Sequence, residues 1–367
     1  MIYRKFGKTG IDISALGFGG MRFESSQSPE DCAMLIQAGY DAGINYFDTA
    51  PIYCNGKSEE YYGRAFAEMK KTRTQKPFYV ATKTFESREP KIRRDLENSL
   101  KRLGLDCIDF YYIWCILRPE QYRERVGRGL LDAFVRLKEQ GLIRHICFST
   151  HMSGNEIEKV IYDYPFDGVL LGYSAMNFAY REMALSFAEK AKCGVAVMNP
   201  LGGGLIPQNP QRFSFLKQRQ EETVVEAALR FLLNDPRITT MLVGMGKMKH
   251  LQEALSAVDG FKAIPAENIE KIRLGLKEAF NELCTGCGYC NYCPEGIPVP
   301  KLMDSYNQYL LSHKKQAIAD RMKWHWEIFY RGNHLDKCTR CMQCERSCTQ
   351  HLPILARFQE IQKELPN

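Results

Sequence analysis

The 367-residue sequence predicts an α/β protein, a TIM-type (β/α)8 barrel followed by a small, helical, cysteine-rich module. Two patterns carry this prediction. Short apolar runs alternate with longer stretches of helical period from about residue 13 to residue 258, and eight of the fourteen cysteines gather after residue 283. With 45% hydrophobic and 25% charged residues, the composition is that of a globular protein that can bury a full-sized core.

Eight strand candidates alternate with eight helix candidates. The expected strands are 14–18, 44–47, 78–82, 108–114, 143–149, 168–171, 195–198 and 239–243. The expected helices are 29–42, 58–69, 91–103, 130–140, 155–163, 180–192, 221–234 and 248–258. Eight such pairs in about 250 residues match the size of a TIM barrel, whose active sites lie on the loops after the C-terminal strand ends.

A doubly wound open sheet is the competing architecture. Such a sheet usually carries a Gly-x-Gly-x-x-Gly turn after its first strand. Residues 17–20 read GFGG here and continue into Met21 and Arg22, so that frame is missing and the barrel is favoured.

The expected domains are a barrel at 1–262, a connecting helix at 263–282 and the cysteine module at 283–367. A linker at 259–266, which contains Gly260 and Pro265, separates the first two. A helical insert at about 301–329 lies between the two cysteine runs of the module.

Charge and hydropathy exclude several classes of partner. The formal net charge is +7, but Lys and Arg alternate with Asp and Glu, so no nucleic-acid partner is expected. No run approaches the roughly 18 apolar residues of a membrane span, and the N-terminus lacks a secretory apolar segment. Clustered cysteines without a signal sequence indicate metal or iron–sulfur ligation, so we expect a soluble cytoplasmic protein with no membrane partner.

Eight cysteines form two runs with gaps of two or three residues. The runs are Cys284, Cys287, Cys290 and Cys293, then Cys338, Cys341, Cys344 and Cys348. They resemble the bacterial dicluster ferredoxin pattern, in which three close thiolates bind one 4Fe-4S cluster and a distant fourth binds the other. The resemblance implies two 4Fe-4S clusters, with Cys348 completing the first set of three and Cys293 completing the second.

A pair of zinc sites is the alternative, because tetrahedral zinc also uses C-x2-C pairs. Three or four cysteines at every third position suit a 4Fe-4S cluster better. Two departures weaken the assignment of the fourth ligands. The first run has two residues before its last cysteine rather than three, and Thr349 stands where proline usually follows the second run.

Four stretches of the barrel carry a second resemblance. They read GINYFDTAPIY at 43–53, VATK at 80–83, LGLD at 103–106 and MNPLGGG at 198–204. The sequence resembles the aldo-keto reductase family, in its branch with a C-terminal ferredoxin module. The resemblance implies NAD(P)-dependent oxidoreductase activity on a small-molecule carbonyl or alcohol.

In that family an Asp, a Tyr, a Lys and a His meet at the barrel mouth, and the first three match Asp48, Tyr53 and Lys83. A tyrosine of pKa near 10 becomes a better proton donor beside a lysine ammonium that a carboxylate holds in place. Taken one by one, Tyr53 could be a core tyrosine and the Lys–Asp pair a plain salt bridge. The three together predict a catalytic site.

Two positions depart from the family pattern. Trp114 stands in place of the histidine, where its indole N–H could still polarise a carbonyl as part of the catalytic site but could shuttle no proton. Simple packing is the alternative role for Trp114. Ser149 keeps the family's nicotinamide contact, whereas Leu170 replaces the expected glutamine. His151, on the neighbouring strand, could supply the missing imidazole or be structural.

The nucleotide-binding positions implied by the resemblance lie on two loops. One loop contains Pro200, Leu201 and Gly202, and the other contains Gly244, Gly246 and Lys247. Backbone amides and a helix N-terminus favour phosphate groups there. The family's arginine position holds His250, so NADP and NAD both remain open.

Three functions follow from these patterns. The first is NAD(P)-dependent carbonyl/alcohol interconversion linked to electron transfer through the clusters, with a ferredoxin- or flavodoxin-like partner. The second is an electron-transfer or scaffold protein whose barrel has lost ordinary carbonyl reduction. The third gives the clusters a structural or oxygen-sensing role. Hydride carries two electrons and each cluster one, and the sequence shows no flavin motif that would couple them.

Overall fold

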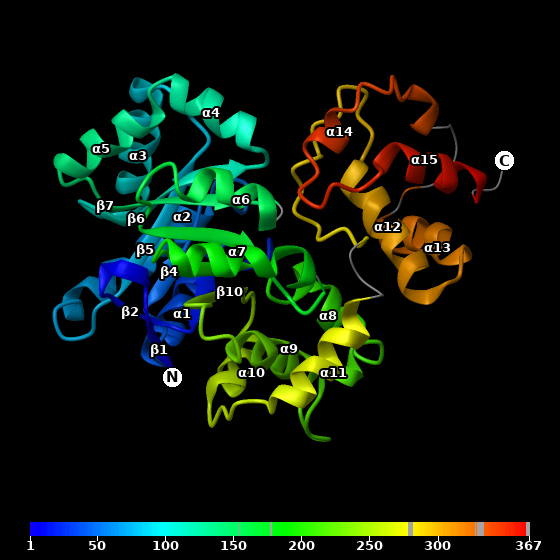
Figure 1. Cartoon of the computed structure of the whole chain (residues 1–367), viewed down its shortest axis with the longest axis horizontal. Coiled ribbons are helices and arrows are strands. Elements are labelled where there is room, and N and C mark those ends of the chain that lie inside the picture. Colours follow the sequence, from blue (N-terminus) through cyan, green and yellow to red (C-terminus); the bar gives the residue numbers. More distant parts are fainter. Residues whose placement is uncertain (153, 177, 278–281, 327, 329–333, 365–367) are drawn as a thin grey trace.

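The computed structural model of the whole chain describes all residues except 153, 177, 278–281, 327, 329–333 and 365–367. A ring of helices surrounds the strands in the N-terminal part of the chain, and a smaller helical part lies beside it (Figure 1).

The barrel is closed by eight parallel strands. They are β3 (Leu16–Gly19), β4 (Tyr46–Asp48), β5 (Tyr79–Thr84), β6 (Ile108–Ile116), β7 (Ile143–Thr150), β8 (Gly168–Gly172), β9 (Gly194–Met198) and β10 (Thr240–Gly244). Each strand pairs with the next along the chain, and β10 pairs with both β9 and β3. The predicted barrel with eight strands is confirmed.

Helices surround the barrel on the outside. They are α1 (Pro29–Asp41), α2 (Ser58–Met69), α3 (Glu89–Leu103), α4 (Pro119–Gly127), α5 (Leu130–Glu139), α6 (Gly154–Ile161), α7 (Phe178–Lys190), α8 (Leu205–Gln208), α9 (Val224–Leu233) and α10 (Met248–Val258). Capping boxes start α1 at Ser28 and α9 at Thr223. Helix α4 was not predicted, because only three of its residues are buried and its sequence shows no apolar stripe.

A short antiparallel hairpin precedes the barrel. Strands β1 (Tyr3–Lys5) and β2 (Asp12–Ser14) pair there, so the predicted strand at 14–18 is divided between the hairpin and β3. Phe6 is fully buried inside the barrel against Gly168 and Gly194, where an added Cβ would lie 2.3 and 2.2 Å from its ring. Because glycine has no side chain at these two positions, the ring of Phe6 can fill this end of the barrel.

The C-terminal part is helical. It contains α11 (Ala266–Lys277), α12 (Val299–Ser312), α13 (Gln316–Trp326), α14 (Gln343–Arg346) and α15 (Ile354–Lys363). The predicted insert at 301–329 forms α12 and α13, and His313 is the C-cap of α12. Residues 327 and 329 of this insert lie outside the described residues. Apolar side chains of α12, α13 and α15 form a second core, which also contains Cys284, Cys290 and Cys348.

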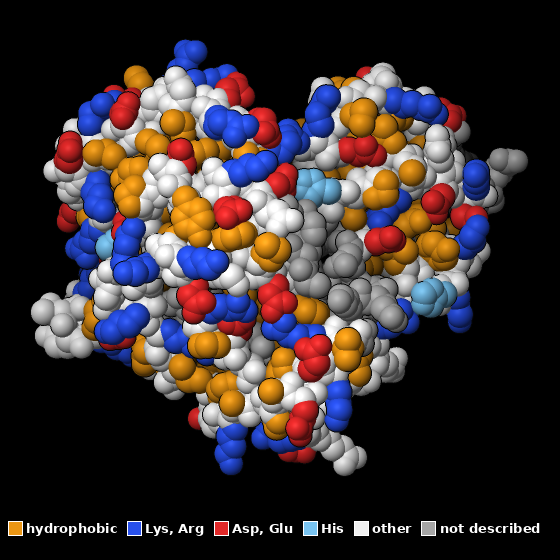
Figure 2. All heavy atoms as spheres, in the orientation of Figure 1, with side chains coloured by type: hydrophobic (Ala, Val, Ile, Leu, Met, Phe, Trp, Pro, Cys, Tyr) orange, Lys and Arg blue, Asp and Glu red, His pale blue; other side chains and the backbone are white. Residues whose placement is uncertain are grey.

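The surface shows both signs of charge. On the face in Figure 2, Lys and Arg side chains alternate with Asp and Glu, as the sequence indicated. Among the described residues, no helix has the length and apolar character needed to cross a membrane.

Candidate active site

A cavity of about 340 Å³ opens at the C-terminal ends of the barrel strands. Its lining comes from the loops after β3, β4, β7, β9 and β10, together with two residues of the cysteine module, Cys287 and Tyr289. This is the end of the barrel at which TIM-barrel active sites lie. The cysteine module therefore contributes directly to the wall of the barrel site.

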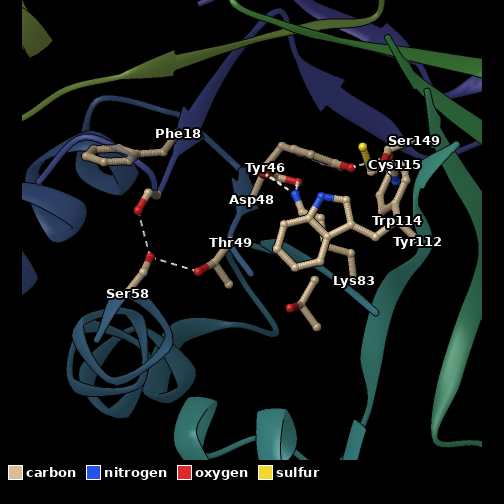
Figure 3. Close-up of polar contacts among 12 residues, drawn as sticks. Phe18, Tyr46, Asp48, Thr49, Ser58, Lys83, Tyr112, Trp114, Cys115 and Ser149 are labelled. Atoms are coloured by element: carbon tan, nitrogen blue, oxygen red, sulfur yellow. Dashed lines mark hydrogen bonds and ion pairs between the residues drawn. The ribbon is translucent and has the colours of Figure 1, made fainter. Parts of the chain in front are cut away.

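Asp48, Lys83 and Tyr53 meet at this end of the barrel. Lys83 Nζ donates to both carboxylate oxygens of Asp48, at 2.7 and 2.8 Å, and both side chains are buried. Lys83 also lies beside Tyr53, with Nζ 5.0 Å from the centroid of its ring. Figure 3 shows the ion pair beside the ring of Trp114. The structure thus brings together the three residues that the sequence grouped.

The electrostatics keep both proton-bearing groups protonated at neutral pH. Burial alone lowers the pKa of Lys83, but Asp48 and Tyr53 more than offset this and raise it above its usual value. Burial raises the pKa of Tyr53 above 10, and Lys83 opposes that rise only in part. The lysine therefore acts on the tyrosine in the expected direction, while desolvation decides the net shift. Tyr53 keeps its proton, as a proton donor requires.

Trp114 occupies the histidine position on β6 and bridges the two parts of the chain. Its ring stacks on Phe85 with centroids 3.9 Å apart and meets Tyr53 edge-on at 5.7 Å. Its Nε1 donates to the hydroxyl of Tyr289 at 3.0 Å. Trp114 therefore packs against Phe85, and its one N–H donates a hydrogen bond to the cysteine module.

His151 and Leu170 line the cavity, whereas Ser149 lies behind it. The Oγ of Ser149 accepts from the backbone N–H of Cys115 at 2.8 Å, and the side chain is 2% exposed. Nδ1 of His151 is buried and has no hydrogen-bond partner among the described residues. Burial lowers the pKa of His151 well below 6.5, and Arg181 and His351 lower it further. His151 is therefore a neutral imidazole at the wall of the site.

The predicted nucleotide-binding residues divide into two groups. Those that line the cavity are Pro200, Leu201, Gly244 and Gly246. Gly202 is buried outside the lining, and Lys247 pairs with Glu24 at 3.0 Å at the surface. The N-terminus of α10 and the glycine-lined walls leave backbone close to the cavity, which fits the phosphates of a nicotinamide nucleotide.

Three residues that line the nucleotide end of the cavity were not among the predicted site residues. They are Arg22, His250 and Glu253. Arg22 follows β3 and donates to the carbonyl of Gly203 at 3.3 Å, whereas Nδ1 of His250 accepts from the N–H of Gly246 at 3.3 Å. Only the position of His250 in the family pattern was a usable signal.

The eight cysteines lie in two groups. Cys284 has Cys287, Cys290 and Cys348 as its neighbours. Burial raises the pKa of the Cys284 thiol, and these neighbouring sulfurs raise it further. The other four line one cavity with Ile297, Val299 and Phe358; they are Cys293, Cys338, Cys341 and Cys344. Each group thus has three cysteines of one run and one of the other, which is the dicluster pattern.

The first group also has the polar surroundings that thiolate ligands need. The N–H of Gly286 donates to the sulfur of Cys284, and the N–H of Leu352 donates to that of Cys348, both at 3.4 Å. The hydroxyl of Thr349, at the unusual position after the second run, lies 3.2 Å from the sulfur of Cys287. Four thiols with such donors fit a 4Fe-4S cluster.

Backbone contacts fix the module against the barrel. An added Cβ on Gly203 would lie 1.9 Å from the carbonyl oxygen of Thr285, so only glycine admits this approach. Arg181, which is fully buried, donates to the carbonyls of Gly172, His151 and Thr349 at 3.0–3.2 Å. Barrel and cluster-binding loops are therefore in direct contact through buried groups.

Fold and site together define an oxidoreductase barrel with an iron–sulfur module. The sequence model of the aldo/keto reductase family matches residues 15–274, and that of a 4Fe-4S dicluster domain matches residues 283–352. The chain belongs to the aldo/keto reductase family and carries a 4Fe-4S dicluster domain after the barrel.

Related proteins cover the barrel. L-galactose dehydrogenase of Arabidopsis thaliana is 25% identical over 294 residues, which are 71% of this chain and 89% of that protein. Aldo-keto reductase yakc (NADP+) of Schizosaccharomyces pombe is 29% identical over 219 residues, or 54% of this chain and 62% of the other. The holo form of aldo-keto reductase AKR11C1 from Bacillus halodurans shares the fold, with a TM-score of 0.63 at 23% identity, over 74% of this chain and 96% of that one.

Proposed function

We propose that the protein interconverts a carbonyl compound and an alcohol with NADP or NAD as hydride carrier, and that its two 4Fe-4S clusters exchange electrons with this site. One observation carries the proposal. The cavity that holds Tyr53 and the glycine-rich nucleotide loops is also lined by Cys287, a cysteine of the first cluster run. A nicotinamide in that cavity would lie beside a cluster ligand.

The residues of the barrel have separate roles in this reaction. The nucleotide, when bound, supplies or accepts a hydride at the substrate carbon. Tyr53 gives its proton to the carbonyl oxygen in reduction and takes it back in oxidation. Lys83 stabilises the charge that this transfer leaves on Tyr53, and Asp48 holds Lys83 in place. His151 is a neutral hydrogen-bonding group rather than an acid.

The nucleotide phosphates would lie at the end of the cavity formed by Gly244, Gly246, Arg22 and His250. Arginine and an N-terminal helix end both favour phosphate oxygens. The fission yeast relative names NADP+, which supports NADP as the first nucleotide to test. Ser149 and Lys247 contribute only if nucleotide binding draws them from their present partners.

One of the two clusters would be buried, and the other would lie near the surface. The first would be held by Cys284, Cys287, Cys290 and Cys348, next to the barrel cavity. The second would be held by Cys293, Cys338, Cys341 and Cys344, where Cys341 and Met342 are exposed. Each cluster, when bound, carries one electron at a time, so the two clusters together would account for the two electrons of one hydride. This arrangement suits a ferredoxin- or flavodoxin-like partner that meets the second cluster from solution.

A second candidate is an electron-transfer or scaffold protein without ordinary carbonyl chemistry. The observation that favours it is the bond from Trp114 to Tyr289, because the only N–H at the family's histidine position is already engaged. In that case a nucleotide or other ligand would bind without turnover.

An anaerobic titration separates the two candidates. We expect NADPH or NADH to bleach the visible absorbance of about eight irons per chain and to produce the EPR signals of reduced clusters. Iron and sulfide are quantified first, and dithionite serves as the positive control for cluster reduction. Full reduction by dithionite with no response to either nucleotide would contradict the coupling and support the scaffold function.

The pH dependence of reduction tests the role of Tyr53. A proton donor whose pKa lies above 10 stays protonated below that value. The kcat/KM for carbonyl reduction is therefore expected to be constant from about pH 6 to 9 and to fall only above about pH 10, as Tyr53 loses its proton. A fall centred between about pH 7 and 8 would instead mean that Lys83 outweighs burial.

A further inference from the structure

Tyr289 belongs to the cysteine module but lies in the barrel site. It stands between Cys287 and Cys290, and it is one of the two residues of that module that line the barrel cavity. Its ring meets that of His151 edge-on at 5.4 Å and that of Phe85 at 6.4 Å. Its environment is therefore formed by barrel residues.

An irregularity in β6 directs Trp114 toward Tyr289. The register of β6 against β7 shifts between Ile113 and Ile116, and Cys115 within this bulge has φ of 53°. Bulges next to active sites re-aim side chains, and a non-glycine residue with positive φ is costly. The bulge places the indole N–H 3.0 Å from the hydroxyl of Tyr289, so this strain has a local function.

The hydroxyl of Tyr289 is held by one hydrogen bond and has a weak acceptor close by. Trp114 donates to its oxygen, and the thiol of Cys115 is a neighbouring polar group. Sulfur is a weak acceptor. A carbonyl oxygen entering the cavity would be a much stronger acceptor for the phenol proton, and Trp114 would keep the phenol in place.

We infer that Tyr289 is a substrate-contacting residue of the barrel site, which donates a hydrogen bond to the carbonyl oxygen where the family's histidine is missing. This inference rests on the proposed function. In reduction, a hydride forms the new C–H bond, the C=O π pair moves to oxygen, and the proton of Tyr53 forms the O–H bond. Tyr289 keeps its own proton and stabilises the developing charge on oxygen.

The surrounding side chains define the class of substrate. Around Tyr53 and Tyr289 the cavity is lined by neutral His151 and by Leu170 and Met198, and the one carboxylate there, Asp48, is paired with Lys83. Among the described residues around Tyr53 and Tyr289, none offers an unpaired charge to match a charged group next to the carbonyl. The site therefore suits an uncharged aldehyde or ketone with an apolar ring or chain.

Tyr289→Phe tests the contact, with Tyr292→Phe as the matched control. Tyr292 lies in the same cysteine run but is 79% exposed. With 4-nitrobenzaldehyde as probe, Tyr289→Phe is expected to lower kcat/KM by about 10- to 100-fold and to weaken binding of the aldehyde several-fold, with unchanged NADPH affinity and iron content. Tyr292→Phe is expected to match the wild type in all four measurements.

The outcomes separate this inference from the proposed function. Wild-type protein that binds 4-nitrobenzaldehyde without reducing it overturns the proposed function, whereas weaker aldehyde binding in Tyr289→Phe still supports the contact. Equal kcat/KM and equal aldehyde affinity in Tyr289→Phe and wild type, with intact clusters, overturn the inference and leave Tyr289 as a latch between the two parts.

A second variant tests the inference if Tyr289→Phe fails to retain its clusters. Trp114→Phe keeps an aromatic ring for the stack on Phe85 and removes the N–H that holds the phenol, together with part of the volume of the indole. It is expected to lower kcat/KM for 4-nitrobenzaldehyde by about 3- to 10-fold, and to have no further effect when combined with Tyr289→Phe. Additive losses in the double variant would show that Trp114 does not act through Tyr289 and would overturn the inference.

Discussion

Tyr53→Phe is expected to lower the rate of NAD(P)-dependent carbonyl reduction by about 10²- to 10⁴-fold, the range for loss of a positioned acid. Phenylalanine keeps the ring that packs edge-on against Trp114 and beside Lys83, and it removes only the hydroxyl. Nucleotide affinity and the iron content of the clusters are therefore expected to stay unchanged. Steady-state kinetics with NADPH and 4-nitrobenzaldehyde measure the effect.

Tyr3→Phe is the control for this experiment. Tyr3 lies in the N-terminal hairpin, half exposed, and its hydroxyl donates to the carbonyl of Gly43. Its removal is expected to leave the rate within about twofold, since surface changes of this kind shift stability by about 0.5 kcal/mol or less. A Tyr53→Phe protein that retains the wild-type rate would exclude Tyr53 as the acid.

Arg181→Met is expected to lower the free energy of unfolding by about 3–5 kcal/mol. The side chain is fully buried and donates to three carbonyl groups, two on the barrel and one, that of Thr349, on the cluster-binding module. Methionine fills part of the volume but leaves these carbonyls without their donor. The midpoint of thermal unfolding, followed anaerobically by circular dichroism, should fall by about 4–7 °C.

Arg118→Met is the matched control for Arg181→Met. Arg118 also crosses from barrel to module, where it donates to the carbonyl of Arg346 at 3.1 Å, but it is exposed. Its loss should change the free energy of unfolding by about 0.5 kcal/mol or less. Equal midpoints for the two variants would mean that the buried arginine does not join the two parts of the protein.

The barrel could be predicted because its signals are local, whereas Asp48, Tyr53 and Lys83 were grouped by the resemblance to the aldo-keto reductase family. Alternation of apolar runs and helical stretches recurs eight times, and it reports which residues face the interior. Parallel strands end at the same face of a barrel, so polar residues at neighbouring strand ends come together without knowledge of the full packing. Helix α4 escaped prediction because it buries little and has no apolar stripe.

The sequence could not predict whether the side chain of a candidate site residue faces the cavity or binds a competing partner. Lys247 follows the turn that contains Gly244 and Gly246, but it pairs with Glu24 from the loop after β3. Ser149 has the family's residue type but accepts from the backbone of Cys115. In both cases a competing partner from a distant segment sets the orientation of the side chain, and no local pattern records that partner.

By itself, the sequence determined a barrel of eight strand–helix pairs and two cysteine runs of 4Fe-4S type, and its resemblance to the aldo-keto reductase family predicted a catalytic group at the strand ends. The barrel and the cysteine runs follow from periodicity and from spacings of a few residues. Only the tertiary structure decided that Cys287 and Tyr289 line the barrel cavity, that Trp114 donates to Tyr289, and that Arg181 joins the two parts. Such contacts depend on how two surfaces far apart in the chain pack together, and packing of that kind leaves no period or spacing in the sequence.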